Sequence, residues 1–451
     1  MKFKLIISFL FILFLCESSQ AQGLFNIRKK RDKKNVLKPE EIKKALIPID
    51  TSTKKQFLLK EVYNVAVLLP FYLDNMDDHL KAKKEFQYEK IEVGDENAMK
   101  IEEEEDLVKI YPKSKMALSF YEGILLALDT LQKLGLSCNL KVYDTKNDTN
   151  VLLKIRSSLI NDSLDLIIGP VYNKNMTIMA KYAFNYKVPI ISPLSSKPVA
   201  LRGNPYFVMA NPTINTQCKT LVNYMFKNYK NKKILIVKED RRRESRAAKI
   251  LENCLNDIHR NYKSDQNDGD SKSWLTMIRI SDGDYWSLKK NLQDTSLNVV
   301  AISSSNEAFV SKVLKYLVQK ADSNAVVFGL PNWSKFETIE TETFQRLQTH
   351  IPSTYFIDLE ADNTKWLRAK YRSWYKSEPD KHVINGFDIG YYYLGLLQKY
   401  GNSIIDELEE DDQKSIHTSY EHHTLGIKYG LENKYVSILK FQNFQLVKVG
   451  E

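Results

Sequence analysis

Polar residues follow directly after two of the apolar runs that predict buried strands. Gly169-Pro170-Val171-Tyr172-Asn173 comes after the run 164–168 and opens a helical segment, and Leu194-Ser195-Ser196 comes after the run 188–192. In open α/β sheets, ligands bind beside the carboxyl ends of the strands. Free backbone N–H groups at the start of a helix favour an anionic group, and a neighbouring serine hydroxyl adds a hydrogen bond to it.

Three further positions extend this predicted site. Asp240 follows the strand expected over 233–237, the run Ser303–Glu307 (SSSNE) follows the strand expected over 299–303, and Phe71 follows the first strand. The alternative explanation is that Asn173 and Ser196 only cap a helix and a turn, as such residues commonly do. The predicted ligand-binding residues are Phe71, Tyr172, Asn173, Leu194, Ser195, Ser196, Asp240, Ser305 and Glu307.

The sequence lacks the common catalytic motifs. It contains no GxSxG, HExxH or GxxxxGK[ST], and no GxGxxG after a predicted strand. The segment Asp265-Gln266-Asn267-Asp268-Gly269 departs from a calcium-binding loop because its glycine is fifth rather than sixth. Glu421-His422-His423 is expected at the surface, since adjacent side chains point apart and do not converge on a metal. We therefore expect a protein that is not an enzyme, with no metal and no cofactor.

The elements that position these residues alternate between short apolar strands and amphipathic helices. The 451 residues, of which 43% are hydrophobic and 27% charged, are enough for two or three domains. Strands that alternate with helices predict an α/β fold with parallel sheets, and two successive rounds predict two such lobes. The predicted strands cover 62–69, 140–143, 164–168, 188–192, 206–209, 233–237, 276–280, 299–303 and 325–329, and the predicted helices cover 116–134, 151–160, 173–186, 214–229, 243–258, 285–292 and 308–319.

The first 21 residues predict export. Two lysines precede the apolar run 5–15, which is too short to span a bilayer, and Ser19-Gln20-Ala21 offers small residues for cleavage. This pattern is typical of a signal peptide (1–21) and predicts a periplasmic protein, with lipid attachment through Cys16 as the alternative. The next segment, 22–61, holds 12 Lys and Arg against 5 Asp and Glu. We expect it to be a basic tether that is attracted to an anionic envelope surface, and we expect no nucleic-acid partner.

Two other features of the sequence leave alternatives open. The segment 74–113 contains 13 acidic and 7 basic residues, which predicts an exposed insertion, or alternatively a lid or an arm that binds a partner. Cys138, Cys218 and Cys254 remain after removal of the signal peptide. Their odd number and the lack of a CxxC spacing exclude a disulfide-rich scaffold and a cysteine zinc site, while one bridge stays open.

The order of the segments resembles the type I periplasmic binding proteins, among them the leucine/isoleucine/valine-binding proteins of ABC importers. The resemblance spans about residues 62–451. Near the carboxyl terminus, GLENKYVSILKF is most similar to a bacterial subgroup in which this domain is often joined to a LysM peptidoglycan-binding module. The motifs that carry the resemblance are VAVLLPF, FYEGILLALDTL, KVYDTKND, DLIIGPV, VPIISPLSS, NPYFVMANPT, KKILIVKED, AVVFGLPNW, YFIDL and NGFDIGYYYLGLL.

The resemblance implies two α/β lobes that are joined by three hinge crossovers and enclose a ligand when they close. Lobe 1 would comprise 62–207 plus 360–423, and lobe 2 would comprise 208–358 plus 424–451. In amino-acid-binding members, a serine after the GPV-type turn and a small hydroxyl residue after the next strand hold the ligand carboxylate. The matching positions are Asn173, which departs from this pattern but has an amide that can donate, and Ser196. Glu307 lies near the position of the carboxylate that meets the ligand ammonium.

Two functions follow from this resemblance. The first is capture of a small ligand, amino-acid-like or anionic, in the cleft between the lobes, for an ABC permease or a sensor. The second is a ligand-free scaffold that binds envelope proteins, because the same fold serves as an interaction domain in an outer-membrane lipoprotein that activates peptidoglycan synthases. We place ligand capture first because the clusters at the strand ends are polar.

Overall fold

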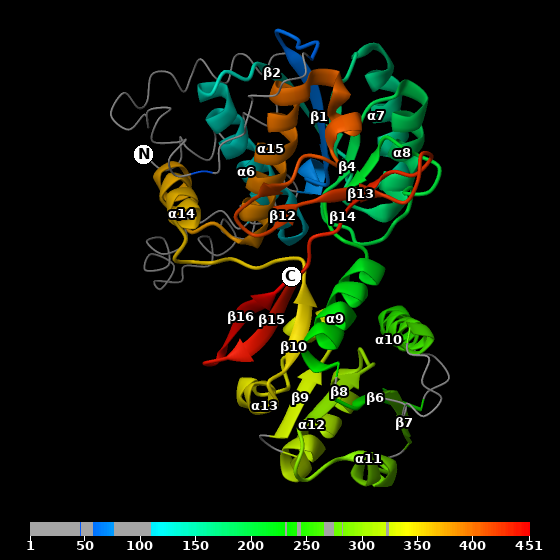
Figure 1. Cartoon of the computed structure of the whole chain (residues 1–451). Coiled ribbons are helices and arrows are strands. Elements are labelled where there is room, and N and C mark those ends of the chain that lie inside the picture. The colour runs from blue at the N-terminus through cyan, green and yellow to red at the C-terminus, as the bar shows by residue number, and fades with distance from the viewer. Residues whose placement is uncertain are drawn as a thin grey trace, which may run out of the picture. The chain divides into compact units, whose positions relative to one another are not determined.

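The computed structural model describes residues 46, 57–75, 110–230, 232–240, 245–265, 275–281, 283–321 and 324–451 (Figure 1). The predicted signal peptide, most of the predicted tether and most of the insertion 74–113 lie outside these residues. The chain forms two compact units: unit 1 ends at Asn211 and resumes over Ile357–Asn433, and unit 2 comprises Pro212–Phe356 and Lys434–Glu451. The chain therefore passes three times between the units. Among the described residues, no helix is both long and apolar enough to span a membrane.

Unit 1 is built around one seven-stranded sheet. Its strands are β1 (Tyr63–Leu69), β2 (Cys138–Asp144), β3 (Leu166–Ile168), β4 (Ile190–Ser192), β5 (Phe207–Met209), β13 (His422–Thr424) and β14 (Leu431–Asn433). They lie in the order β13-β14-β5-β4-β3-β1-β2. All neighbouring pairs are parallel except β13 with β14 at the edge.

Helices cover both faces of this sheet, because β1 is apolar on both sides as a buried parallel strand must be. Val65, Val67 and Leu69 face a cluster with α6 and α15, whereas Ala66 and Leu68 face a cluster with α7 and α8 (Figure 1). The helical elements of unit 1 are η2 (Pro112–Ser114), α6 (Lys115–Lys133), α7 (Thr149–Ser158), η3 (Leu159–Asn161), α8 (Asn173–Tyr186), α14 (Asp362–Tyr375), α15 (Lys381–Tyr400), η6 (Gly401–Ser403) and α16 (Ile404–Glu407). A small pair, β11 (Gln413–Lys414) with β12 (Ser419–Tyr420), completes the unit.

Unit 2 repeats this architecture. Its strands are β6 (Ile234–Glu239), β7 (Leu275–Ile280), β8 (Asn298–Ile302), β9 (Ala325–Phe328), β10 (His350–Ser353), β15 (Ser437–Gln442) and β16 (Gln445–Gly450), in the order β16-β15-β10-β9-β8-β6-β7. The carboxyl-terminal hairpin is added to the sheet through antiparallel pairing of β15 with β10. Its helical elements are α9 (Ile214–Tyr229), α10 (Arg246–Asp265), α11 (Trp286–Asn291), α12 (Glu307–Ala321), η5 (Pro331–Lys335) and α13 (Thr341–Arg346).

The predicted α/β class with two parallel-sheet lobes is confirmed, and the lobe boundaries differ in three places. Residues 208–211, 357–358 and 424–433 lie in unit 1 rather than in the second lobe. For the first and the last of these segments, the physical reason is that β14 pairs in parallel with β5, which ties both to the unit 1 sheet. The described end of the predicted tether also belongs to unit 1, because Leu46 is buried and the ring of Phe57 packs edge-on against Tyr400.

His422 differs from the expectation of a surface position, and the three cysteines settle whether a disulfide forms. His422 is buried rather than exposed, and its Nε2 lies 2.9 Å from the hydroxyl of Tyr393. Burial lowers the pKa of His422 to about 3. Cys138, Cys218 and Cys254 are all free thiols in this structure.

Candidate functional site

Both sheets have a switch point at which the strand order reverses. In unit 1 it lies between β1 and β3, and in unit 2 between β6 and β8, because the second and third strands of each unit lie on opposite sides of its first strand. Ligands of open α/β sheets bind at such points, outside the carboxyl ends of the strands. The predicted residues of the sequence follow these four strands and the neighbouring β4.

At the switch point of unit 1, Asp144 holds the segment that follows β1. Its carboxylate accepts hydrogen bonds from the backbone N–H groups of Phe71 (2.8 Å), Tyr72 (3.1 Å) and Leu73 (2.9 Å). Tyr72 has a φ of 53°, a left-handed conformation that a large residue rarely adopts. Such backbone strain costs about 1–3 kcal/mol and is found where the surroundings hold a residue in place for a purpose.

This conformation places Tyr72 among other tyrosines. Its hydroxyl is within hydrogen-bonding reach of the Tyr172 hydroxyl, and burial followed by this contact raises the pKa of Tyr72 to about 12. The ring of Tyr72 also meets the ring of Tyr111 edge-on, with centroids 6.0 Å apart. The hydroxyl of Tyr72 is therefore neutral, and it can donate as well as accept a hydrogen bond.

The turn after β3 leads from Gly169 into α8. Gly169 has a φ of 91°, and a Cβ there would lie 2.4 Å from the carbonyl oxygen of Leu68, so only glycine fits at this approach of β3 to β1. At the start of α8, the Oδ1 of Asn173 accepts a hydrogen bond of 2.7 Å from the Ser195 hydroxyl. No side chain caps the helix, and the Nδ2 of Asn173 has no partner among the described residues.

Asn175, in the first turn of α8, is a further polar residue of this region. Its side chain is buried, and neither amide atom has a hydrogen-bond partner among the described residues. Buried polar atoms normally have a partner, either in the protein or in a water molecule or ligand. The start of α8 therefore offers backbone N–H groups, the Asn173 amide and an unsatisfied buried amide within three residues.

At the switch point of unit 2, the polar side chains bond mainly to one another. The Nδ2 of Asn306 donates to both carboxylate oxygens of Glu239 at 3.1 Å, and this contact joins the ends of β6 and β8. Asp240 accepts a hydrogen bond of 3.2 Å from Ser281, and Ser305 lies 2.9 Å from the hydroxyl of Ser245. These contacts form a polar rim at the carboxyl ends of the strands.

Beneath this rim lies a buried charged pair. The Nζ of Lys238 is 3.0 Å from Oε2 of Glu252, and Oε1 of the same carboxylate accepts a hydrogen bond of 2.7 Å from Ser303. Both charged side chains are only 9% exposed. The pair links α10 to β6 and β8 below the rim, and it is not positioned to meet a ligand.

Known proteins share this architecture. A sequence profile described as periplasmic binding protein matches residues 112–252, while no curated protein sequence matches the chain. A branched-chain amino acid ABC transporter periplasmic ligand-binding protein from Burkholderia xenovorans LB400 matches 86% of this chain and 95% of its own, with a TM-score of 0.52 and 13% identity. The chain has the type I periplasmic-binding-protein fold.

Two other solved structures share this fold at similar distance. An ABC transporter substrate-binding protein from Desulfitobacterium hafniense, in complex with Leu, matches 86% of this chain and all of its own, with a TM-score of 0.50 and 12% identity. Full-length LpoA from Haemophilus influenzae matches 87% of this chain and 60% of its own, with a TM-score of 0.51 and 11% identity. The chain is thus about equally similar in structure to substrate-binding proteins of ABC transporters and to LpoA.

Within this fold, two of the predicted ligand residues are placed differently from expectation. Phe71 is buried to 1% exposure, where its ring packs edge-on against Tyr121, because the Asp144 contacts turn its neighbour Tyr72 outward instead. Glu307 is engaged by its own unit: its Oε1 accepts hydrogen bonds from the backbone N–H and the hydroxyl of Thr338, at 2.6 and 2.8 Å. These hydrogen bonds hold the pKa of Glu307 below its usual value.

The other predicted residues lie at the strand ends as expected from the sequence. Tyr172, Asn173, Ser195 and the half-buried Leu194 and Ser196 gather at the switch point of unit 1. Asp240 and Ser305 lie at that of unit 2. The list of predicted ligand residues omits Tyr72, Asn175, Glu239 and Asn306, although Asn306 lies within the run Ser303–Glu307 and each of the others is within two positions of a predicted residue.

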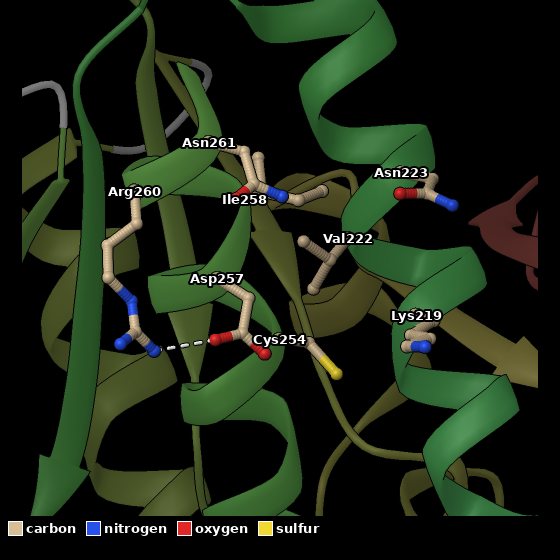
Figure 2. Close-up of a pocket in the computed structure, with 8 residues that line it drawn as sticks. All are labelled: Lys219, Val222, Asn223, Cys254, Asp257, Ile258, Arg260 and Asn261. Atoms are coloured by element: carbon tan, nitrogen blue, oxygen red, sulfur yellow. Dashed lines mark hydrogen bonds and ion pairs between the residues drawn. The ribbon is translucent and has the colours of Figure 1, made fainter. Parts of the chain in front are cut away.

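Unit 2 also contains a surface hollow of about 640 Å³ between α9 and α10. Figure 2 shows Val222 and Cys254 between the two helices and the ion pair of Asp257 with Arg260 at its side. None of the predicted ligand residues lines it. Arg260 and Asp257 are largely exposed and already paired at 2.6 Å, so the hollow offers little that would select a ligand.

Proposed function

We propose that this chain is a periplasmic, non-enzymatic binding protein that captures a small ligand with an anionic group. The observation that carries this proposal is the start of α8, where an uncapped helix, the Asn173 amide and the bonded Ser195 hydroxyl lie at the switch point of unit 1. A helix start with free N–H groups favours an anion. Signal peptide 1–21 would direct the protein to the periplasm, where an ABC permease or a sensor would be its partner.

In this proposal the ligand is held first by unit 1 and then enclosed when unit 2 closes on it. The ligand's anion would lie at the start of α8, and Tyr72 and Tyr172 would contact its remaining part. Ligand shifts the open and closed populations only by its difference in affinity for the two states. About 5.5 kcal/mol of such difference moves the population from 1:99 to 99:1.

Isothermal titration of the full chain with amino acids, short peptides, aromatic and aliphatic carboxylates and cell-wall fragments tests the proposal. We expect one class of anionic compound to bind and to raise the unfolding temperature. Asn173→Ala and Ser195→Ala should each weaken that binding about 10-fold or more, as expected for loss of a hydrogen bond to a charged group. Asn185→Ala, at the exposed opposite end of α8, is the control. Absence of heat and of thermal shift with every class would count against ligand capture.

The second candidate function is a ligand-free scaffold of the cell envelope that takes part in peptidoglycan assembly. It is favoured by the engagement of Glu307 with Thr338 and of Ser305 with Ser245, which leaves the unit 2 rim bonded to itself. Affinity capture from envelope extracts, with the full chain and with a deletion of 76–112, tests it. Capture of the same envelope proteins by the full chain alone would support the scaffold, and identical capture by both chains would contradict a role of the insertion.

A further inference from the structure

Unit 1 exposes large apolar side chains at the amino edge of its sheet, opposite the candidate ligand site. The loop 425–430, between β13 and β14, holds Leu425 and Ile427, which are 65% and 98% exposed. Near the end of α8, Phe184 and Tyr186 are 49% and 46% exposed, and Ile160 in η3 is 51% exposed. Single exposed apolar residues are ordinary, whereas several at one edge indicate an interaction surface.

Hydrogen bonds tie these segments to the same edge. The backbone N–H of Gly430 donates to the carbonyl of Leu201 at 2.7 Å, next to the loop. The Nδ2 of Asn204 donates to the carbonyl of Ala180 in α8 at 2.8 Å. The hydroxyl of Tyr182 in turn donates to the carbonyl of Leu159 in η3 at 2.9 Å, one residue before Ile160.

The topology gives the reason for this arrangement. A helix that follows a parallel strand runs back toward the amino ends of the strands, so α8 and α7 with η3 end at that edge. The loop 425–430 lies there as well, because it leads into the amino end of β14, which is parallel to β5. The two helices lie together on one face of the sheet (Figure 1).

The charged residues of these segments are mostly basic, whereas the exposed Glu409 lies beside the loop 425–430, because its Oε1 accepts a hydrogen bond of 2.8 Å from the backbone N–H of Thr424. We call the segments 154–163, 181–187, 201–206 and 425–430 the basic edge. It contains a single acidic residue, Asp162, whose carboxylate already pairs with Lys141 at 2.5 Å. Its basic residues are Lys154, Arg156, Lys181, Lys187, Arg202 and Lys428.

We propose that the basic edge docks on a membrane surface that contains anionic lipids. Protruding aliphatic tips such as Leu425 and Ile427 suit insertion at the boundary of headgroups and acyl chains, and flanking lysines and arginines suit the headgroup phosphates. A protein partner would require an acidic surface with apolar pockets, whereas a lipid interface supplies both features at once. This surface shares no residue with the candidate ligand site or with the basic segment 22–61.

Flotation of the full chain with vesicles tests the proposal. We expect binding to vesicles of phosphatidylcholine with phosphatidylglycerol, weak binding to pure phosphatidylcholine, and a decrease as salt is raised. The double variant Leu425→Asp/Ile427→Asp should bind the anionic vesicles with an affinity lower by about tenfold or more, since membrane affinity scales with buried apolar area. Lys181→Glu/Lys187→Glu should lose the preference for phosphatidylglycerol.

The matched control is Phe444→Asp. Phe444 is 69% exposed at the turn between β15 and β16 of unit 2, so the control replaces an exposed apolar residue by one aspartate outside the basic edge. It should bind like the parent chain. The parent and all variants retain the basic segment 22–61, so a difference in binding between the double variant and this control reports on the basic edge. Equal binding by the double variant and the parent would overturn the proposal. So would failure of the parent to bind vesicles of either composition, which would assign the edge to a protein partner instead. Unchanged thermal unfolding of each variant verifies its fold.

Discussion

Single side chains in unit 1 have roles beyond filling the core. Asp144 gathers three successive backbone N–H groups and so determines that Tyr72, rather than Phe71, points outward. Glu122 is another such residue, because its carboxylate accepts a hydrogen bond of 2.8 Å from the hydroxyl of Tyr371 in a largely buried setting. Replacing either carboxylate should change the free energy of unfolding or the affinity for the ligand.

Asp144→Ala should lower the free energy of unfolding by about 2–3 kcal/mol, since four backbone N–H groups, those of Phe71–Leu73 and of Lys146, lose this carboxylate as an acceptor. If Tyr72 contacts the ligand as proposed, the same variant should also bind the ligand more weakly than Tyr72→Phe does. Chemical denaturation and titration calorimetry provide the two measurements. The exposed Asp148, which caps α7, offers a control of the same residue type.

Glu122 predicts a dependence of stability on pH. Burial raises the pKa of Glu122 from 4.5 to about 7. The hydrogen bond from Tyr371 lowers this pKa, and the negative charge of nearby Asp380 raises it. Because the folded state holds this proton more tightly than the unfolded state, its contribution is complete below pH 4.5 and is lost as pH rises through 7. The loss amounts to at most about 3 kcal/mol.

Glu122→Gln should therefore flatten the stability profile between pH 5 and pH 8, as measured by urea denaturation at several pH values. Glu342→Gln, at an exposed position of α13, should leave the profile as it is in the parent. An equal slope in the parent and in Glu122→Gln would show that the carboxyl is not perturbed.

At the level of elements, the pair α6 and α15 forms the largest helix contact of unit 1. The two helices approach at glycines, and a Cβ at Gly123 would lie 2.1 Å from the carbonyl oxygen of Val383. A Cβ at Gly386 would lie 2.0 Å from that of Phe120. Lys370 of α14 adds a buried charge to α6, at 2.9 Å from Asp129 and between the rings of Trp366 and Trp374.

Gly123→Ala should destabilise unit 1 by about 3 kcal/mol or more, because backbone atoms cannot yield as a flexible side chain does. Gly386→Ala should have a similar effect. Ser157→Ala, on the exposed face of α7, should change the free energy of unfolding by less than about 0.5 kcal/mol. Thermal and urea denaturation of the three variants compare them, and a tolerated alanine at both glycines would contradict the close approach.

At the level of the molecule, each unit is assembled from separate parts of the sequence. The sheet of unit 2 receives its last two strands from residues 437–450, after the chain has passed through unit 1. Ile438, Leu439 and Phe441 of this hairpin are buried in the core of unit 2, and Phe441 stacks on Phe344 with ring centroids 4.4 Å apart. Unit 2 thus depends on the last residues of the chain.

A chain that ends at Asn433 should lose a stable unit 2. It loses the burial of three large side chains, about 5–9 kcal/mol in sum, and it exposes the edge of β10 to aggregation. We expect limited proteolysis to cut within 212–356 while unit 1 resists, and gel filtration to show aggregates. A chain that lacks only Glu451 is the control. Protease resistance of 212–356 in the truncated chain would contradict this dependence.

The regular first part of each lobe was predictable from the sequence. The helices α8 and α9 begin and end at the predicted residues, because their apolar spacing and their starts at Asn173 and Ile214 are clear in sequence. The strands after residue 329 were not assigned from periodicity. β10 and β13 contain polar residues such as His350 and His422 that only tertiary pairing buries.

The candidate site was predictable to within about two positions. Strand ends indicate where polar side chains gather, but they do not reveal which of two neighbours points outward. The backbone conformation of Tyr72 depends on Asp144, which lies on another strand, and the engagement of Glu307 depends on Thr338. Such choices are made by long-range hydrogen bonds, which a single sequence does not display.

The three passages of the chain between the units also order events during synthesis. A ribosome makes the chain from the amino terminus, and domains made of one continuous segment can fold while the rest is still being translated. Here β13 and β14 reach the sheet of unit 1, and β15 and β16 that of unit 2, only with about the last thirty residues. Until then each half lacks an edge of its sheet, so the nascent chain stays incompletely folded.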